Sequence, residues 1–489
     1  MHHLTKTDFI QFLNCPNSLW LLKNKPDVYN TYKGEFSLFL EKLIREGYEV
    51  EEYVAKLYPQ AVDLDHCTPE EVTDHLQIPG WYTQATLVTD AGLYARMDMI
   101  EVTAPNVITI YEIKSSTSIK TDKKHNHLKD ICFQQYVAEE NGYVISAVQH
   151  VHLNKDFVKV GDINPAELLK VEDVTEAVAA IYEQIKEEIK AALEHINRPE
   201  INESLCTCLD ITRANHCDTF SYFNQSIPEH PIYELNNIRD AKIQTLRDSN
   251  VVSISDIPTG FKLSPYQTLQ KQSVDRDTAI IDYEAIAESL DSLAFPLYFF
   301  DYETLPFAVP RVSGYKPHQH TPVQYSLHIL HEGDSLTHHE YLADKLEPPE
   351  KLIQSMQEHI GTTGTLVSWY ASFEKTRNRE MAELYPAYEP FLTNLNDRTY
   401  DLMDIFKKDY VDARFEGSQS IKKVQPVLVP DLSYKALEVQ SGTMAVDAAE
   451  RLYEMTDEVE IAELREAMLQ YCKLDTLAMV KIYEYLRDL

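Results

Sequence analysis

Two acidic residues separated by a single position, Asp301 and Glu303, follow directly on an apolar run of the chain. If that run is a strand, both side chains point to the same face, because side chains alternate along a strand. Much later, Tyr471 and Asp475 have the i,i+4 spacing that places two residues on one face of a helix. Carboxylates gathered in this way can hold divalent metal ions that stabilise the attacking and leaving oxygens of a phosphodiester.

A second group of candidate residues lies in the first half of the chain. Asp98 belongs to one alternating stretch, and Glu112 and Lys114 belong to another, so both stretches are expected to be strands. Glu112 and Lys114 share a face, and Asp98 joins them if the two strands pair. Two carboxylates could then hold a metal while the lysine positions or activates a water. The alternative is an exposed strand face with a solvated Glu–Lys pair.

Further polar residues surround this second group. Gln134 and Tyr136 follow in an expected helix, and an earlier expected helix offers the carboxylate of Glu51. The helix with Gln134 and Tyr136 is preceded by a segment rich in lysine and histidine that suits contacts with phosphate groups. The lysines of that segment that we expect to bind nucleic acid are Lys120, Lys123 and Lys124.

In order and spacing, this group resembles the PD-(D/E)xK nuclease core in its RecB-like form, a branch that includes the exonuclease of CRISPR adaptation. The residues that carry the resemblance are Asp98, Glu112, Lys114, Gln134 and Tyr136. The resemblance implies that the two acidic residues bind metal and that the lysine is catalytic. It also implies that the glutamine and the tyrosine support the substrate side. Glu51 occupies the helix position where the family usually has histidine, and it could serve as a further ligand.

The acidic pair and the Tyr-x3-Asp helix resemble the DnaQ-like 3′→5′ exonucleases of the RNase H-like fold. The resemblance implies two metal ions at the carboxylates and a water oriented by Tyr471. Glu374 occupies the position of the family's third carboxylate, and Asp401 and Asp404 are competing candidates. The implied metal ligands are Asp301, Glu303, Glu374, Asp404 and Asp475. Lys422 and Lys423 could present cations to a phosphate, or could lie in an ordinary loop.

Four of the seven cysteines flank the first half of the chain. RecB-like nucleases of the iron–sulfur type have one cysteine before the nuclease core and three after it. The resemblance therefore implies a [4Fe-4S] cluster that joins the two ends of the domain. Its ligands would be Cys15, Cys206, Cys208 and Cys217. Their spacing differs from the usual one, and zinc or unligated thiols are alternatives. The remaining cysteines, Cys67, Cys132 and Cys472, are expected to be ordinary buried thiols.

The helices and strands expected around these residues indicate an α/β protein with three parts. Residues 1–225 would form a RecB-like PD-(D/E)xK nuclease domain, and residues 289–489 a DnaQ-like exonuclease domain of the RNase H-like fold. A helical connector that resembles a helix-hairpin-helix would occupy residues 226–288. Expected helices cover residues 36–57, 171–196, 238–246 and 458–486, with a short element at 251–257. Expected strands cover residues 107–111, 296–300, 322–329, 340–342 and 365–370.

Composition limits the function classes. The chain has 489 residues, which predicts two or three domains, and its formal net charge is −33. Such a charge argues against a protein that coats nucleic acid, because phosphate contacts come from Lys and Arg. A local basic groove can nevertheless coexist with an acidic exterior. The sequence has no signal peptide and no apolar run long enough to cross a membrane, so we expect a soluble cytoplasmic protein.

Together these patterns predict a nuclease that acts on DNA, single-stranded or at ends, and needs Mg²⁺ or Mn²⁺. No P-loop is present, so no nucleotide cofactor is expected. A role in DNA repair or in defence against foreign DNA, with partner proteins of those processes, follows only by analogy. The alternatives are a catalytically inactive nucleic-acid-binding or scaffolding subunit and an RNA-directed exonuclease.

Overall fold

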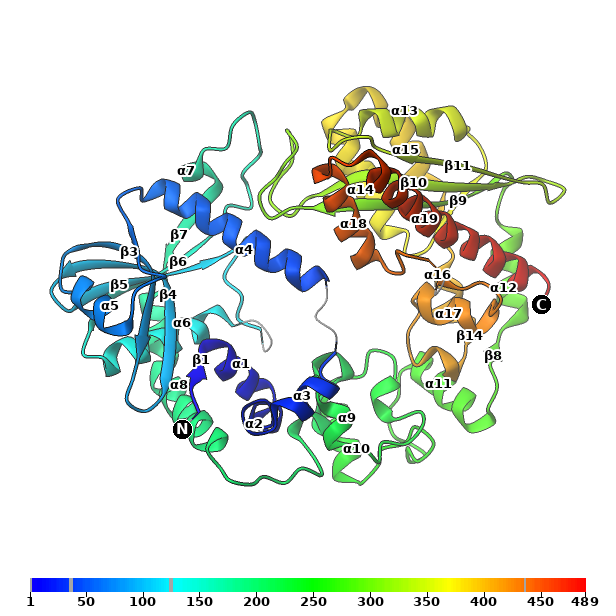
Figure 1. Ribbon diagram of the computed structural model, residues 1–489. Coiled ribbons are helices and arrows are strands. Elements are labelled where there is room, and N and C mark those ends of the chain that lie inside the picture. Colours follow the sequence, from blue (N-terminus) through cyan, green and yellow to red (C-terminus); the bar gives the residue numbers. More distant parts are fainter. Residues whose placement is uncertain (1, 35–37, 123–125, 435–436) are drawn as a thin grey trace. The chain divides into compact units, whose positions relative to one another are not determined.

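The computed structural model describes residues 2–34, 38–122, 126–434 and 437–489 (Figure 1). The chain divides into two compact units, each a mixture of helices and sheet, which confirms the α/β class. The first unit comprises Met1–Phe36, Leu43–Ile227 and Arg239–Arg247. The second comprises Ser37–Lys42, Pro228–Ile238 and Asp248–Leu489. The segment expected as a connector is therefore divided between the two units.

A single mixed sheet forms the centre of the first unit. Its strand order is β2-β3-β4-β5-β6-β7, with β1 paired to β4. The strands β3, β4 and β5 are antiparallel neighbours, whereas β5 and β6 are parallel and are joined through helix α6 (His127–Glu140), as a parallel pair requires. The strands are β1 Leu4–Thr5, β2 Val62–Asp63, β3 Gly80–Val88, β4 Leu93–Ala104, β5 Val107–Lys114, β6 Val144–Leu153 and β7 Leu169–Asp173.

Helices α6 and α8 supply much of the apolar surface that packs onto this sheet. Helix α6 begins where the side chain of Asn126 accepts a hydrogen bond from the backbone N–H of Lys129, a favourable N-cap. The α-helices of this part of the chain are α1 Lys6–Asn14, α2 Pro16–Asn24, α3 Pro26–Tyr32, α4 Leu38–Leu57, α5 Pro69–His75, α6 His127–Glu140, α7 Pro165–Leu168, α8 Thr175–Ile196, α9 Phe220–Phe223 and α10 Asp240–Asp248.

The second unit contains a sheet of strand order β11-β10-β9-β12-β13. Strands β9, β10 and β11 are antiparallel, and β12 and β13 run parallel to β9. These strands are β9 Leu297–Pro306, β10 His320–Leu330, β11 Leu336–Leu342, β12 Thr365–Ser368 and β13 Thr399–Asp401. A separate pair consists of β8 Ile280–Ile281 and β14 Tyr410–Val411.

Helices cover both faces of the second sheet. Phe299 on β9 packs with Tyr483 of α19, whereas Phe300 packs with Met356 of α13. Figure 1 shows α19, in red, running along the sheet. The helices are α11 Pro265–Arg276, α12 Tyr283–Asp291, α13 Glu350–His359, α14 Ser372–Leu384, α15 Glu389–Asp397, α16 Met403–Phe406, α17 Ile421–Leu428, α18 Gly442–Glu454 and α19 Glu458–Arg487.

Several expected elements differ in the structure, and the strand expected at residues 340–342 is β11, which begins at Leu336. The helix expected from residue 171 begins only at Thr175, because β7 occupies the preceding residues and pairs with β6. The strand expected to end at residue 300 continues to Pro306, because its pairing with β10 extends through both carboxylates. Residues 251–257 form neither helix nor strand apart from a bridge at Ser253, since α10 ends before Asn250, which has a left-handed φ of 58°. The residue from which the first helix was expected, Phe36, lies outside the described residues.

Candidate active sites

In the first unit, strands β4 and β5 place the acidic residues side by side. Met99 pairs with Tyr111, so the next positions along the two strands, Asp98 and Glu112, are neighbours. The backbone N–H of Ile113 donates a hydrogen bond of 2.8 Å to Oδ2 of Asp98. The structure therefore brings together the two carboxylates that the sequence pattern singled out.

The carboxylate of Glu112 is fully buried and lies between cations. Its Oε1 is 2.5 Å from Nζ of Lys114 and 2.7 Å from Nζ of Lys6. The side chain of Gln134 donates a hydrogen bond to Oε2. Burial alone would raise the pKa of Glu112, but the two ammonium groups hold it well below its usual value. Glu112 is therefore a carboxylate at neutral pH.

Lys114 is held between two acidic groups. Besides Glu112, it contacts Oδ2 of Asp130, a residue of α6, at 3.1 Å. Burial would lower the pKa of Lys114, but the charges of Glu112 and Asp130 raise it above its usual value. In this arrangement Lys114 is a fixed ammonium group, which suits electrostatic positioning of a phosphate or a water better than removal of a proton.

Helix α4 brings a third carboxylate to the same region. Glu51 and Asp98 line one cavity together with Gln84, whose side chain donates a 2.8 Å hydrogen bond to Glu51. Burial and the neighbouring Asp98 raise the pKa of Glu51 to about 7. Burial and Glu112 raise the pKa of Asp98 to about 6. Carboxylates that oppose one another's ionisation are stabilised by a bound cation.

The structure does not bring Tyr136 to these carboxylates. Residues two positions apart on a helix lie on nearly opposite sides, so Tyr136 turns away from the side of Gln134. Its ring lies in the core beneath Nζ of Lys186, a residue of α8, at 5.6 Å. Tyr136 therefore packs in the core, and its expected support of the substrate stays a prediction. Lys120 is exposed, and Lys123 and Lys124 lie outside the described residues.

Two features of this site were not expected from the sequence. Lys6, at the start of α1, reaches Glu112 across more than a hundred residues of chain, so no local motif could indicate it. The rings of His127 and His150 are stacked, and Nε2 of His150 lies 2.9 Å from Nδ1 of His127. Burial lowers the pKa of His127 to about 3, so this pair is neutral at physiological pH. Glu112 on β5 pairs with His150 on β6. Because the sequence does not reveal this register, it did not indicate that His150 lies beside Glu112.

In the second unit, Asp301 and Glu303 share a face of β9. Their ligand atoms and the Sγ of Cys472, on α19, all lie within 4.8 Å of one another. Burial and the nearby Asp475 raise the pKa of Asp301 to about 8. Burial and Asp301 raise the pKa of Glu303 well above its usual value. Cys472, which we expected to be an ordinary buried thiol, is buried but belongs to this acidic group.

A lysine and two tyrosines surround Asp475. Nζ of Lys422 is 2.7 Å from Oδ1 of Asp475, and the hydroxyl of Tyr434 donates a 2.5 Å hydrogen bond to the same oxygen. The ammonium of Lys422 also lies 4.7 Å from the ring centroid of Tyr471. The structure thus brings Tyr471, Asp475 and Lys422 together. Tyr434 was not indicated by any motif, because it comes from the segment between α17 and α18, for which no element was expected.

The remaining candidates of the second unit differ in position. Glu374, in the first turn of α14, is buried, and its Oε2 has no hydrogen-bond partner. Burial and Asp301 raise the pKa of Glu374 well above its usual value. Asp404 is exposed and pairs with Lys407 at 2.7 Å, so the structure does not bring it to the other carboxylates. Asp401 accepts the backbone N–H of Tyr370 at 2.9 Å.

Lys423 also differs from its expected role. Its Nζ forms an ion pair of 2.7 Å with Glu416. Lys422 and Lys423 are consecutive on α17, and consecutive residues of a helix point in directions about 100° apart. Only Lys422 is therefore directed to the acidic group.

The four cysteines expected to bind a cluster come together in the first unit. The Sγ atoms of Cys15, Cys206, Cys208 and Cys217 all lie within 4.8 Å of one another, so they could hold a metal. Three of them are buried. Cys132, a residue of α6, is a buried thiol as expected, whereas Cys67 is partly exposed.

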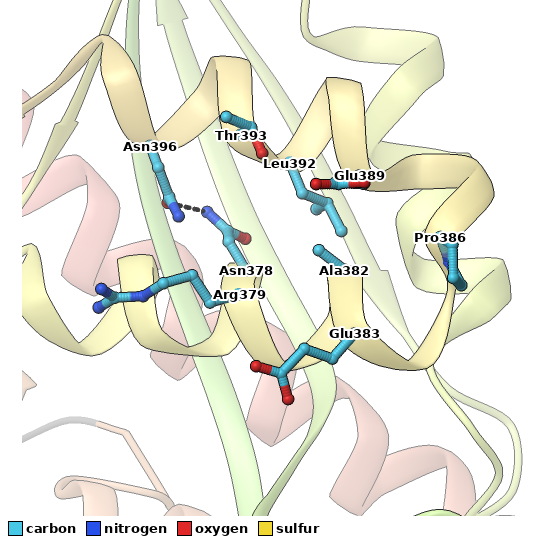
Figure 2. A pocket seen from close by; sticks show the side chains of 9 residues that line it. All are labelled: Asn378, Arg379, Ala382, Glu383, Pro386, Glu389, Leu392, Thr393 and Asn396. Carbon is cyan, nitrogen blue, oxygen red and sulfur yellow. Dashed lines mark hydrogen bonds between the residues drawn. The ribbon is translucent and has the colours of Figure 1, made fainter.

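One further cavity lies between α14 and α15 (Figure 2). Asn378 and Asn396 meet there, with a 2.9 Å hydrogen bond from Nδ2 of the first to Oδ1 of the second. None of the candidate metal ligands is among the residues that line it. It carries no arrangement suited to catalysis.

Comparisons with known proteins give two findings. A family model described as "Domain of unknown function (DUF2779)" matches residues 298–420. The chain is also 27% identical over 211 residues to "Uncharacterized protein MG366 homolog" of Mycoplasma pneumoniae, covering 39% of this chain and 32% of that protein. The match therefore spans about a third of the relative's length. Within the described ranges, none of the helices is long and apolar enough to cross a membrane.

Proposed function

We propose that this protein is a metal-dependent nuclease that hydrolyses phosphodiester bonds of DNA, from ends, with one carboxylate site in each unit. The observation that carries the proposal is the approach of Asp301 and Glu303 on β9 to Cys472 on α19, with ligand atoms within 4.8 Å of one another, beside Asp475 of the same helix, which raises the pKa of Asp301. Asp301 and Glu303 lie well over a hundred positions before Cys472 in the chain, and the fold brings them together in one acidic group. Burial of so many carboxylates is unfavourable without a cation.

The topology of the second unit supports this proposal. Three antiparallel strands followed by two parallel ones, with the acidic pair on the central strand β9, match the RNase H-like arrangement expected for a DnaQ-type exonuclease. In the first unit, β5 carries Glu112 and Lys114, and α6 follows with Gln134. That order matches the RecB-like PD-(D/E)xK core.

The donor atoms at both sites fit Mg²⁺ or Mn²⁺. Carboxylate oxygens are the ligands that these hard cations prefer. Asp301, Glu303, Glu374 and Asp475 would hold the ions in the second unit, and Glu51, Asp98 and Glu112 in the first. Bound ions would polarise the phosphodiester and favour ionisation of a water.

The protein's own residues then have separate tasks. Lys422 and Tyr434 fix the orientation of Asp475 by binding the same oxygen. Tyr471 would orient the attacking water from the same helix face. In the first unit, Lys6 and Gln134 fix Glu112, and Lys114 would bind the scissile phosphate by its charge.

A second candidate function is a nucleic-acid-binding or scaffolding subunit without catalysis. It is favoured by the net charge of −33. It is also favoured by the contacts of Glu112, both of whose oxygens already bind side chains, namely Lys6, Lys114 and Gln134. A metal ion would have to displace at least one of these side chains. RNA instead of DNA as the substrate is a variant of the first proposal. A cytoplasmic location and a role in repair or defence remain proposals by analogy.

One substrate panel separates these candidates. End-labelled single-stranded DNA, double-stranded DNA and RNA are incubated with the protein in Mg²⁺, in Mn²⁺ and in chelator. A nuclease shortens DNA in metal and not in chelator, and shortening of RNA alone identifies the RNA-directed variant. Intact substrates that nevertheless shift in a binding assay support the scaffolding function.

A further inference from the structure

We infer that Cys15, Cys206, Cys208 and Cys217 form a mononuclear tetrahedral site for a zinc ion, and not the four-iron cluster that the sequence resemblance implies. The inference rests on how closely the four sulfur atoms approach one another. It does not depend on nuclease activity.

The separation of the sulfur atoms distinguishes the two kinds of site. A tetrahedral zinc ion with bonds of about 2.3 Å to four thiolates places each pair of sulfurs about 4 Å apart. In a cubane each thiolate binds a different iron at an outer corner, which places the sulfurs about 6 Å apart. All four Sγ atoms here lie within 4.8 Å of one another. The four sulfurs therefore surround a space that suits one ion.

The cavity beside the thiols also favours a single ion over a four-iron cluster. A cubane bound by four thiols needs a cavity lined by all of them. The cavity that adjoins this cluster is lined by Cys15 and Cys217, and Cys206 and Cys208 are not among its lining residues. A single ion held among four sulfur atoms needs no such cavity.

The surroundings are those of a closed structural site. Cys15, Cys206 and Cys208 are at most 2% exposed and belong to an apolar cluster with Trp20 and Phe223. Four thiolates complete the coordination of a zinc ion and leave no position for a water, as in structural sites. Soft thiolate ligands favour zinc over Mg²⁺ or Mn²⁺.

Hydrogen bonds to the sulfurs support bound thiolates. The side chain of Asn224 donates to Sγ of Cys206 at 3.4 Å, and the hydroxyl of Thr219 lies 3.7 Å from Sγ of Cys217. Such outer contacts orient metal ligands. Thr219 also lies 3.0 Å from the hydroxyl of Ser18, on α2, so the same network joins the segment after α8 to the start of the chain.

The test is the metal content of the full chain, produced in iron-replete cells and purified without oxygen. We expect about one zinc per chain, no acid-labile sulfide and no visible absorbance. Cys208→Ser should lose the zinc, while Cys67→Ser, which removes a thiol outside the cluster, should retain it. About four irons and four sulfides per chain would overturn the inference, and so would a chain that binds no metal.

A second measurement covers the case in which Cys208→Ser does not fold. The wild-type chain is exchanged with Co²⁺, whose spectrum reports the geometry and the ligands of the ion. Intense thiolate-to-metal bands with the pattern of a tetrahedral ion are expected. A spectrum of octahedral Co²⁺ bound by oxygen, or no uptake, would contradict a tetrathiolate site whether or not the protein cleaves DNA.

Discussion

Glu112 and Asp475 are each held by a residue from a distant segment of the chain: Nζ of Lys6 lies 2.7 Å from Glu112, and the hydroxyl of Tyr434 donates a hydrogen bond to Asp475. Asp301, Glu303 and Asp475 could be named from the sequence because D-x-E on a strand and Tyr-x3-Asp on a helix are local patterns. Lys6 and Tyr434 could not, because each reaches its carboxylate from a distant segment without a motif of its own. Partners of this kind are fixed by tertiary packing.

Lys422 and Lys423 form a matched pair for testing the second site. Lys422→Ala removes the ammonium that lies 2.7 Å from Asp475, so we expect a loss of at least about tenfold in cleavage. Lys423→Ala removes only a partly exposed ion pair with Glu416 and should change cleavage less than about twofold. Both variants are assayed in a Lys114→Ala background, in which the first site is silenced. Equal losses would contradict the assigned role of Lys422.

Asp301 and Asp404 form a second matched pair. Asp301→Asn removes a partly buried charge that Asp475 repels, so in metal-free buffer we expect the variant to be more stable than wild type. Because folding raises the pKa of Asp301 from about 4 to about 8, the ionised form destabilises the fold. The gain should therefore be small near pH 4, grow as pH rises, and level off above pH 8.

The measurement is chemical denaturation across that pH range, together with Mn²⁺ titration. Asp301→Asn should lose Mn²⁺ affinity at the second site. Asp404→Asn, at an exposed position, should leave Mn²⁺ affinity and the pH profile unchanged. If Asp404→Asn impairs metal binding as much as Asp301→Asn does, the exclusion of Asp404 is wrong.

At the scale of elements, long periodic segments were predicted best. The final helix, expected at residues 458–486, is α19 at Glu458–Arg487. The prediction of a regular element at residues 251–257 was wrong. The prediction of helix at residues 171–173 was also wrong, because the pairing of β7 with β6 overrides the helical pattern there. Alternation and helix periodicity are local, whereas strand pairing and register depend on the whole sheet.

The N-terminus of α19 gives a prediction about stability. The side chain of Asp457 accepts hydrogen bonds from the backbone N–H groups of Val459 and Glu460 at 2.9 and 3.1 Å. Asp457→Ala should lower the free energy of unfolding by about 1 kcal/mol, measured by urea denaturation. Asp457→Asn should recover most of that loss because asparagine also caps helices. An Asp457→Ala variant as stable as wild type would show that this cap contributes little.

For the protein as a whole, we predict two separate active sites in one chain. Each unit carries its own sheet, its own core and its own acidic group. The net charge argues against a protein that coats nucleic acid. It did not locate either acidic group, because a charge summed over 489 residues does not say where in the fold the charges lie. The four cysteines show the same limit, since their placement, one before the expected nuclease core and three after it, suggested a cubane, whereas the sulfur separations favour a single ion.

Two active sites in one chain are tested by cleavage of end-labelled DNA in Mg²⁺ or Mn²⁺ by wild type, Lys114→Ala, Asp301→Ala and the double variant. Lys423→Ala serves as the control for a surface change. We predict that each single variant loses a distinct set of products and that the double variant cleaves nothing. If wild type leaves every DNA intact, or if the double variant cleaves as wild type does, two carboxylate active sites are contradicted.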